Sequence, residues 1–254
     1  MIRVILWDID NTILSFDAAE KAALKKEFEE FELGEFNEEM LQRYIGINRK
    51  YWQALERGEM TKPEVLVGRF VEFFEVYGLP VDKAPAFNER YQVLLGDTIC
   101  FHDDAYNIVK ELKGKVLQCA TTNGTKIAQV KKLKNSGLDQ LLDLIFISED
   151  VGVEKPAKEF FDKVFADVNV WLCENTANGE EATAIGQGEL LLSEVIIVGD
   201  SLTSDILGGN NAGIKTCWYN PKGVANGTDA KVDYEIKDLH EIFAILESNC
   251  SESN

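Results

Sequence analysis

Short apolar runs alternate with segments of helical spacing over most of this chain, and that alternation limits the folds it can adopt. The apolar runs occupy residues 1–7, 115–121, 143–148, 194–199, 214–219 and 234–236. The segments with helical spacing lie between them, at residues 104–112, 125–137, 156–167, 203–212 and 239–246. Strands buried on both faces, each followed by a helix, are typical of a parallel sheet. The predicted fold class is therefore α/β, a parallel sheet with helices on both faces.

Residues 16–97 break this alternation, because they show helical spacing throughout and no convincing strand. The first apolar run precedes this segment and the others follow it, so one domain is expected to interrupt another. We expect residues 1–15 and 98–254 to form an α/β core, and residues 16–97 to form an inserted all-helical cap domain.

Within the helical segment, the spacing predicts where individual helices begin. Asp17 with Glu20 resembles a capping arrangement, so a helix is expected from Asp17. Apolar residues at 40–45 and 51–55 predict two further helices. Thr61, which is followed by Lys, Pro and Glu, is a typical helix start.

Residues 169–188 fit neither pattern. Val168, Val170 and Leu172 alternate with other residues, and Asn178-Gly179 is a turn sequence. The segment predicts either a β-hairpin around that turn or a solvated loop, and the residues alone do not choose between the two.

The charge of the chain narrows the class of partner. It has 44 Asp plus Glu against 26 Lys plus Arg, a net charge of −18. Such a balance argues against a nucleic acid polymer or an anionic membrane as partner, but not against a small phosphorylated ligand beside local cations. No apolar run approaches the ~18 residues of a membrane span, and no signal-peptide pattern is visible. The cysteines form no CxxC pair, so we expect a cytoplasmic protein with reduced thiols.

Polar side chains follow the predicted strands at the ends where open parallel sheets bind ligands. They are Asp8 and Asp10, Thr122 and Asn123, Lys155, and Asp200 with Asp205. Each has an ordinary structural explanation when taken alone, as a strand end, a helix cap or a surface charge. Taken together, they would assemble acids, a hydroxyl and a cation around one crevice.

Such a set suits phosphoryl transfer. A carboxylate can attack phosphorus and form an aspartyl-phosphate, which divides one difficult displacement into two. Neighbouring carboxylates alone would repel a phosphate ester, so a hard cation such as Mg²⁺ is expected as cofactor. A lysine, a hydroxyl and backbone N–H groups would stabilise charge on the transferring group.

The segments DxDxT, hydroxyl–Asn–Gly, Lys-Pro and GDSxxxD, in this order, resemble the four motifs of the haloacid dehalogenase-like (HAD) hydrolase superfamily. The helical insertion after the first motif is similar to the C1 cap of that superfamily. The resemblance implies a Rossmann-like core, with Asp8 as nucleophile and Asp10 as the general acid that later activates water. It also implies that Thr122, Asn123 and Lys155 bind the phosphoryl group.

The same resemblance implies a Mg²⁺ site formed by Asp8, the backbone carbonyl of Asp10 and Asp200, with Asp205 in support. Haloacid dehalogenases proper carry a non-acidic residue at the position of Asp10, so its acid favours phosphate esters. Residues 52–61 and 207–214 further resemble the 5′-nucleotidases that act on pyrimidine and non-canonical nucleotides. The extra length between the helix at 156–167 and the strand at 194–199 departs from that family.

The predicted function is a Mg²⁺-dependent phosphatase acting on small phosphate monoesters, nucleoside 5′-monophosphates in particular, through an aspartyl-phosphate. The alternatives are a sugar-phosphate phosphomutase, a phosphatase of the phosphoglycolate type and, at a greater distance, a 2-haloacid dehalogenase. A phospho-Asp signalling receiver would use similar residues, but it lacks a large insertion after the first strand. Among the cap arginines, Arg69 is best suited to a buried or substrate-facing role.

Overall fold

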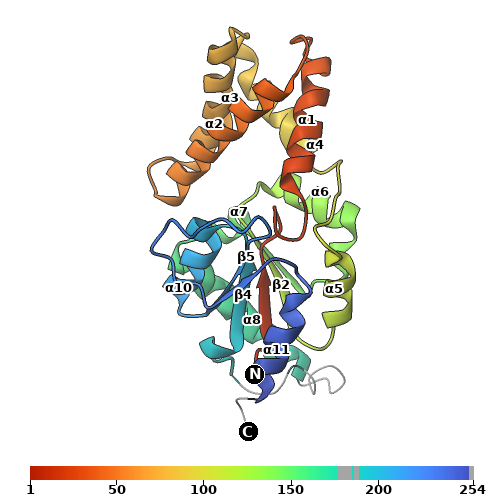
Figure 1. Ribbon diagram of the computed structural model, residues 1–254, viewed down its shortest axis with the longest axis vertical. Coiled ribbons are helices and arrows are strands. Elements are labelled where there is room, and N and C mark those ends of the chain that lie inside the picture. Colours follow the sequence, from red (N-terminus) through yellow and green to blue (C-terminus); the bar gives the residue numbers. More distant parts are fainter. Residues whose placement is uncertain (177–184, 186–188, 252–254) are drawn as a thin grey trace.

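The computed structural model describes residues 1–176, 185 and 189–251, and these residues form a six-stranded sheet in which every pair of neighbouring strands is parallel (Figure 1). The strand order is β3-β2-β1-β4-β5-β6. The strands are β1 (Val4–Trp7), β2 (Leu117–Thr122), β3 (Leu144–Ile147), β4 (Val195–Gly199), β5 (Lys215–Tyr219) and β6 (Tyr234–Ile236). The predicted α/β class with a parallel sheet is confirmed.

Strand β1 lies in the middle of the sheet, and its register explains why the motifs converge. Leu6 lies opposite Cys119 of β2 on one side and Ile197 of β4 on the other. Because the three strands run in the same direction, their carboxyl ends meet at one edge of the sheet. The residues that follow these strands therefore open onto the same space.

Helices cover both faces of the sheet (Figure 1). Ile5 and Trp7 of β1 pack in a core with α5 (Ala105–Leu112), α6 (Lys126–Ser136) and α11 (Glu241–Ser251). Val4 and Leu6 point to the opposite face and pack with α8 (Lys158–Thr176) and α10 (Leu207–Ala212). This alternation follows from the period of two along a strand. Short helical turns complete the connections: α7 (Ser148–Val151), η2 (Leu138–Gln140), η3 (Leu192–Glu194) and η4 (Leu202–Ile206).

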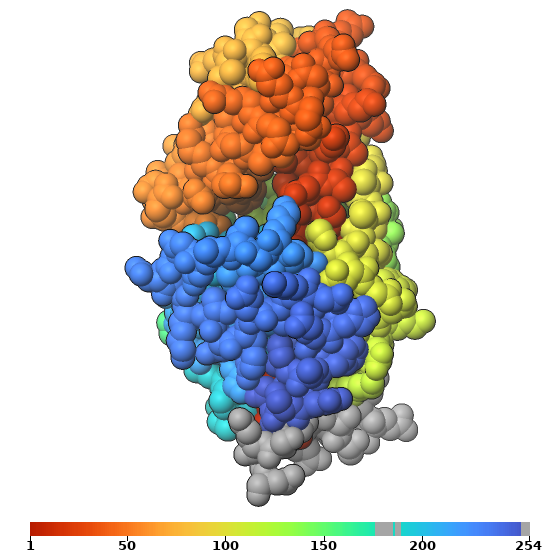
Figure 2. Space-filling view, in the orientation of Figure 1, coloured from red at the N-terminus to blue at the C-terminus, as the bar shows by residue number. Residues whose placement is uncertain are grey.

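A separate group of helices stands above the carboxyl edge of the sheet, as Figures 1 and 2 show. Its elements are α1 (Phe16–Glu30), α2 (Glu38–Glu56), α3 (Lys62–Tyr77), η1 (Val81–Lys83) and α4 (Ala84–Leu94). Their shared core is largely aromatic, and its buried rings include Phe28, Tyr44, Phe70, Phe73, Phe87 and Tyr91. Each fully buried ring of this size contributes roughly 1.5–3 kcal/mol. We call this group the cap helices; the domain boundaries at residues 15/16 and 97/98 stay a prediction.

The two chain segments that connect the cap helices to the sheet lie side by side. The Ser15 amide donates to the carbonyl of Cys100 at 2.8 Å, and the His102 amide donates to the carbonyl of Ile13 at 2.9 Å. Between these bonds, Leu14 forms an antiparallel bridge with Phe101. The segment entering the cap helices and the segment leaving them are thus tied together.

Two expectations for the cap helices are wrong. Residues 40–45 and 51–55 belong to one continuous helix, α2, which runs through Gly46 and Asn48 without a break. Helix α1 is capped by Ser15, whose Oγ accepts a hydrogen bond from the Ala18 amide at 3.3 Å. Glu20 does not cap the helix: it is buried inside the cap helices, where it accepts hydrogen bonds from other side chains.

The hairpin alternative for the segment after residue 167 is also wrong where the structure describes it. Helix α8 continues to Thr176, so Val168 and Leu172 lie one turn apart and are buried, whereas Val170 is exposed. Apolar residues at positions 168 and 172 share a face both in a helix and in a strand, so over so short a stretch the pattern did not distinguish the two. Asn178-Gly179 lies outside the described residues. Elsewhere, the helix expected at 203–212 is divided into a π-helical turn, η4, and α10.

Across the part of the chain that the structure describes, each helix is either too short or too polar to span a lipid bilayer.

Candidate active site

The turn after β1 places both acids of the first motif beside one cavity. Asp8 and Asp10 follow the end of the strand, and both side chains line this cavity. The chain reverses at Asn11, which has a left-handed φ of 62° that asparagine tolerates better than most residues. The Asn11 Oδ1 accepts hydrogen bonds from the amides of Phe16 and Asp17, at 2.9 and 3.2 Å. These bonds join the turn to the first cap helix.

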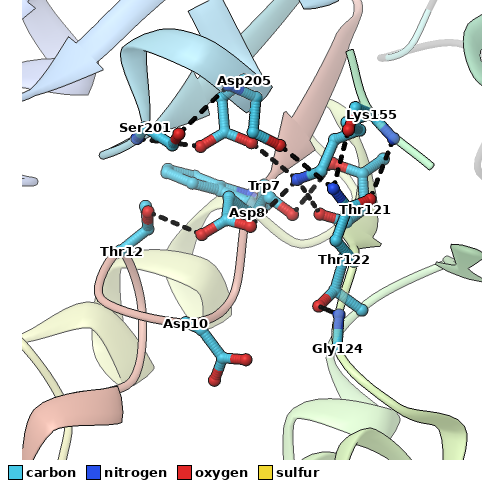
Figure 3. A network of polar contacts seen from close by, with 12 residues as sticks. Trp7, Asp8, Asp10, Thr12, Thr121, Thr122, Gly124, Lys155, Ser201 and Asp205 are labelled. Carbon is cyan, nitrogen blue, oxygen red and sulfur yellow. Dashed lines mark hydrogen bonds and ion pairs between the residues drawn. The ribbon is translucent and has the colours of Figure 1, made fainter. Parts of the chain in front are cut away.

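A buried lysine lies at the centre of the site (Figure 3). The Lys155 Nζ donates to Asp8 Oδ1 at 2.9 Å, to Asp205 Oδ1 at 2.6 Å and to the carbonyl of Thr121 at 2.6 Å. Its side chain is only 1% exposed. Burial acts to lower the pKa of Lys155, but the Asp205 and Asp8 carboxylates outweigh it and raise that pKa above its ordinary value. Lys155 therefore remains a cation.

Asp8 is fixed from two sides. Thr12 donates its hydroxyl hydrogen to Asp8 Oδ2 at 3.0 Å, while Lys155 holds Oδ1. The Thr12 oxygen in turn accepts a hydrogen bond from the Asp200 amide at 3.1 Å. The Asp8 carboxylate is thus held in one orientation by hydrogen bonds to both of its oxygens.

Three carboxylates gather at this point. Among the described residues, Asp8, Asp200 and Asp205 form a group whose ligand oxygens lie within 4.8 Å of one another. Burial, followed by the charge of Asp205, raises the pKa of Asp8 to about 7. Burial and then the charge of Asp8 raise the pKa of Asp200 well above its ordinary value. Crowded anions with hard oxygen donors fit a divalent cation of the Mg²⁺ type, whose charge would offset their repulsion.

Close packing at the end of β4 explains the glycine of the GDS segment. A Cβ on Gly199 would lie 2.2 Å from Asp205 Oδ2, closer than atoms can approach. The Ser201 amide donates to the same Oδ2 at 3.1 Å, and the Ser201 Oγ accepts from the Ser204 amide, which caps η4. Asp205 is therefore held in place by the strand end and the π-helical turn together.

Asp10 has a different environment. Its carboxylate accepts a hydrogen bond from Gln129 Nε2 at 2.7 Å and forms an ion pair with Lys132, and in Figure 3 it points away from the Asp8 cluster. Lys132 is 2% exposed. The sequence reasoning missed both partners. Their signal was the spacing of Thr125, Gln129 and Lys132 on one side of α6, where polar residues lie on the buried face.

The loop after β2 brings Thr122 and Asn123 to the cavity. The Thr122 Oγ accepts a hydrogen bond from the Gly124 amide at 3.1 Å. Asn123 accepts from the Lys155 amide and donates to the Lys155 carbonyl, at 2.9 and 2.8 Å, and also donates to Ser204 Oγ at 3.3 Å. The Asn123 side chain thus joins three loops, and its expected contact with phosphate stays a prediction.

All the residues singled out from the sequence line one cavity of about 380 Å³: Asp8, Asp10, Thr122, Asn123, Lys155, Asp200 and Asp205. The cap helices complete its wall, with residues that include Asn48, Arg49, Trp52, Glu56, Arg69 and Gln92. Arg69 is 1% exposed, as the sequence reasoning allowed. The structure therefore places a polar, cap-derived wall opposite the acid cluster.

Side-chain contacts join the cap helices to the core around this cavity. Thr203 donates its hydroxyl hydrogen to Glu56 Oε2 at 2.7 Å, and Thr125 donates to Gln92 Oε1 at 2.7 Å. Away from the cavity, the buried Lys62 donates to Ser148 Oγ at 2.8 Å. The cavity is thus enclosed by two parts of the chain that meet through polar contacts.

Comparison with known proteins gives consistent matches over nearly the whole chain. The family model described as haloacid dehalogenase-like hydrolase matches residues 5–219. YfnB of Bacillus subtilis, described as a HAD-hydrolase, is 36% identical over 96% of this chain and 95% of its own length. The pyrimidine 5′-nucleotidase PynA of Streptococcus pneumoniae is 31% identical over 98% of this chain and 97% of its own. A crystal structure of YfnB bound to magnesium superposes with a TM-score of 0.84 at 34% identity, covering 96% of this chain and 98% of that one.

Proposed function

Since the chain belongs to the haloacid dehalogenase-like hydrolase family, we propose that it is a phosphomonoesterase whose substrates are nucleoside 5′-monophosphates. The observation that carries the proposal is the separation of the two acids of the first motif. Asp8 is held by Lys155 and Thr12, whereas Asp10 is held by Gln129 and Lys132. The activity in the name of PynA supports a nucleotide as substrate.

In the first step, an oxygen of Asp8 attacks phosphorus while the ester bond to the leaving oxygen breaks. The leaving oxygen takes a proton from the Asp10 carboxyl, so the alcohol departs neutral and an aspartyl-phosphate remains on Asp8. The ammonium of Lys132 lies beside the negative charge that forms on Asp10 in this step. Two acids in different surroundings thereby act as nucleophile and acid.

In the second step, Asp10 accepts a proton from water as that water attacks phosphorus. The bond between phosphorus and the Asp8 oxygen breaks, which releases inorganic phosphate and restores both carboxyl groups. During both steps, Lys155 and the Thr122 hydroxyl face the phosphoryl oxygens from one side of the cavity. The Asn123 side chain holds the backbone of Lys155 in place, and the Gly124 amide donates to the Thr122 hydroxyl oxygen.

We further propose that Asp8, the backbone carbonyl of Asp10 and Asp200 hold Mg²⁺, with Asp205 in support. The ion would supply positive charge next to the phosphoryl oxygens, which the acid cluster alone would repel. The donor set fits, because it consists of hard carboxylate and carbonyl oxygens within a buried, anionic site.

The test is phosphate release by Asp8→Asn with uridine 5′-monophosphate and with p-nitrophenyl phosphate. We expect turnover of both to fall by at least about 1,000-fold, because the amide is not a nucleophile. The control is Asp162→Asn, an exposed acid of α8 that should leave turnover unchanged. Substantial release of phosphate by Asp8→Asn would refute the proposed nucleophile and with it the mechanism.

A further inference from the structure

Arg69 lies in the cavity wall that faces the acid cluster, and it is immobilised there. Its Nη1 donates to Asn48 Oδ1 at 2.6 Å, its Nη2 to Asn88 Oδ1 at 3.4 Å and its Nε to the carbonyl of Leu66 at 3.4 Å. The side chain is 1% exposed and yet lines the cavity. A guanidinium fixed in this way loses little conformational entropy when it binds a ligand.

The guanidinium has donors to spare. An arginine side chain carries five N–H groups. In Arg69, the Nε, Nη1 and Nη2 atoms each donate one hydrogen bond to a described residue. One N–H on each terminal nitrogen therefore has no acceptor among the residues that the structure describes. A ligand that reaches this wall can accept from both.

The charge of Arg69 is offset within the cap helices. Glu20 is 2% exposed and accepts hydrogen bonds from Asn48 Nδ2 at 3.0 Å and from the Tyr91 hydroxyl at 3.2 Å. Burial raises the pKa of Glu20 to about 7, and the positive charge of Arg69 acts against that rise. Above that pH, Arg69 and Glu20 are electrically balanced. The other charged residues of the cap-derived wall, Arg49 and Glu56, have opposite signs, so the wall favours a neutral acceptor over a second anion.

An aromatic surface lies beside these donors. Trp52, one turn after Asn48 on α2, is half-buried and lines the cavity, with the Arg69 guanidinium 5.9 Å from the centre of its ring. A flat apolar surface next to paired donors fits a planar ring that carries a keto oxygen.

The Arg69 network also reaches the phosphate-binding loop. Asn88 Oδ1 accepts from Gln92 Nε2 at 3.0 Å, and Gln92 Oε1 accepts from the Thr125 hydroxyl at 2.7 Å. Thr125 lies three residues after Thr122 and directly precedes α6. Arg69 is therefore held at a fixed position relative to the site of the phosphoryl group.

We propose that Arg69 is a specificity-determining residue that donates hydrogen bonds to a keto oxygen of a planar, uncharged ring lying against Trp52. The ligand class is a phosphate monoester with a pyrimidine-like keto ring at its far end, rather than a bisphosphate or a bare sugar phosphate. This inference rests on the proposed phosphomonoesterase function and adds the group that selects among its substrates.

The first test compares two substrates that differ only at the far end, uridine 5′-monophosphate and ribose 5-phosphate, at about pH 8, where Glu20 is ionised. Arg69→Lys keeps the positive charge but loses the planar pair of guanidinium donors. In this variant, kcat/KM for the nucleotide should fall by about 10- to 100-fold, with a rise in KM. The value for ribose 5-phosphate should change by less than about 3-fold. The control Arg43→Gln, on the exposed side of α2, should alter neither.

Equal losses for the two substrates, or no loss for either, would overturn the assignment of Arg69. Activity towards ribose 5-phosphate also reports that the variant is folded. If Arg69→Lys does not fold, Trp52→Leu gives the same comparison from the neighbouring surface and should show the same selective loss.

The wild-type enzyme supplies an independent test of the charge argument. It should turn over uridine 5′-monophosphate with a kcat/KM at least about 10-fold above that for ribose 1,5-bisphosphate. A preference for the bisphosphate would mean that the wall binds a second anion, and the inference would be wrong. If neither these substrates nor p-nitrophenyl phosphate releases phosphate, the proposed function fails instead, so the two failures are distinguishable.

Discussion

Asp8 and Asp10 are separated by a single residue, yet no side chain in the described part of the chain bonds to both carboxylates. Asp8 lies in a buried cluster with Lys155, while Asp10 contacts Gln129 and Lys132 on the inward face of α6. The difference arises from the turn at Asn11, which redirects the chain between β1 and the cap helices. One tripeptide thus presents two acids in different surroundings, as the proposed division into nucleophile and acid requires.

A third acid, Glu27, lies within the cap helices and does not line the cavity. Glu27 is 0% exposed within the cap helices, and neither of its carboxylate oxygens has a hydrogen-bond partner among the described residues. Burial, with the nearby charge of Glu30, raises the pKa of Glu27 from 4.5 to about 9. The folded state therefore keeps a proton that the unfolded chain releases above pH 4.5.

We predict that Glu27 lowers stability as the pH rises from about 5 to about 9, because unfolding then releases this proton. The glutamine of Glu27→Gln cannot ionise, so the free energy of unfolding of this variant should fall less as the pH rises. At about pH 8 it should exceed the wild-type value by on the order of 2 kcal/mol. Urea denaturation at several pH values measures how the free energy of unfolding of each protein changes with pH. The control is Glu29→Gln, an exposed position on the same helix. Parallel pH profiles for wild type and Glu27→Gln would contradict the prediction.

At the scale of elements, the junction between β4 and η4 illustrates how packing constrains the site. The strand ends at Gly199, and the next turn places Asp205 against the glycine backbone. Strand end and turn must be in contact for Asp205 to reach Lys155. The glycine is therefore required by the close approach, not by its own backbone angles.

We predict that Gly199→Ala lowers the free energy of unfolding by about 1–3 kcal/mol and reduces kcat more than about 10-fold. The added methyl group would force Asp205 and η4 away from Lys155. Gly227→Ala is the matched control, since a Cβ there meets nothing within 4 Å. Chemical denaturation and phosphate release would measure the two effects. An active, stable Gly199→Ala would show that this junction tolerates movement.

The positions of the motif residues could be predicted from the sequence, whereas several helix boundaries and contacts of the cap helices could not. The motif residues were predictable because parallel strands place their carboxyl ends together, whatever the loops contain. The continuity of α2 and the cap at Ser15 were not, because local propensity is weaker than tertiary packing. Contacts between Thr125 and Gln92 depend on where the cap helices settle on the core, which spacing along one helix does not encode.

At the scale of the whole molecule, the net charge of −18 and the anionic site act together on cation binding. The three clustered carboxylates repel one another in the folded state, even with Lys155 beside two of them, and a bound cation reduces that repulsion. A ligand that binds only the folded state also stabilises it by mass action.

We predict that Mg²⁺ at about 100 times its dissociation constant raises stability by about 2.7 kcal/mol, visible as a Tm increase of roughly 5–10 °C. A chelator should abolish both the shift and phosphate release, and added Mg²⁺ should restore them. Asp200→Asn should diminish the shift. An equal shift with KCl at matched ionic strength would show that general screening, rather than a site, is responsible.

The paired segments at Ser15 and Cys100 have a consequence for how such a protein can change over evolution. Because the chain leaves and re-enters the core at neighbouring points, the cap helices can be lengthened, shortened or exchanged without disturbing the strand order. Substitutions that redesign the far wall of the cavity then leave the acids at the strand ends in place. The acids at the strand ends and the residues of the far wall can therefore change independently of one another.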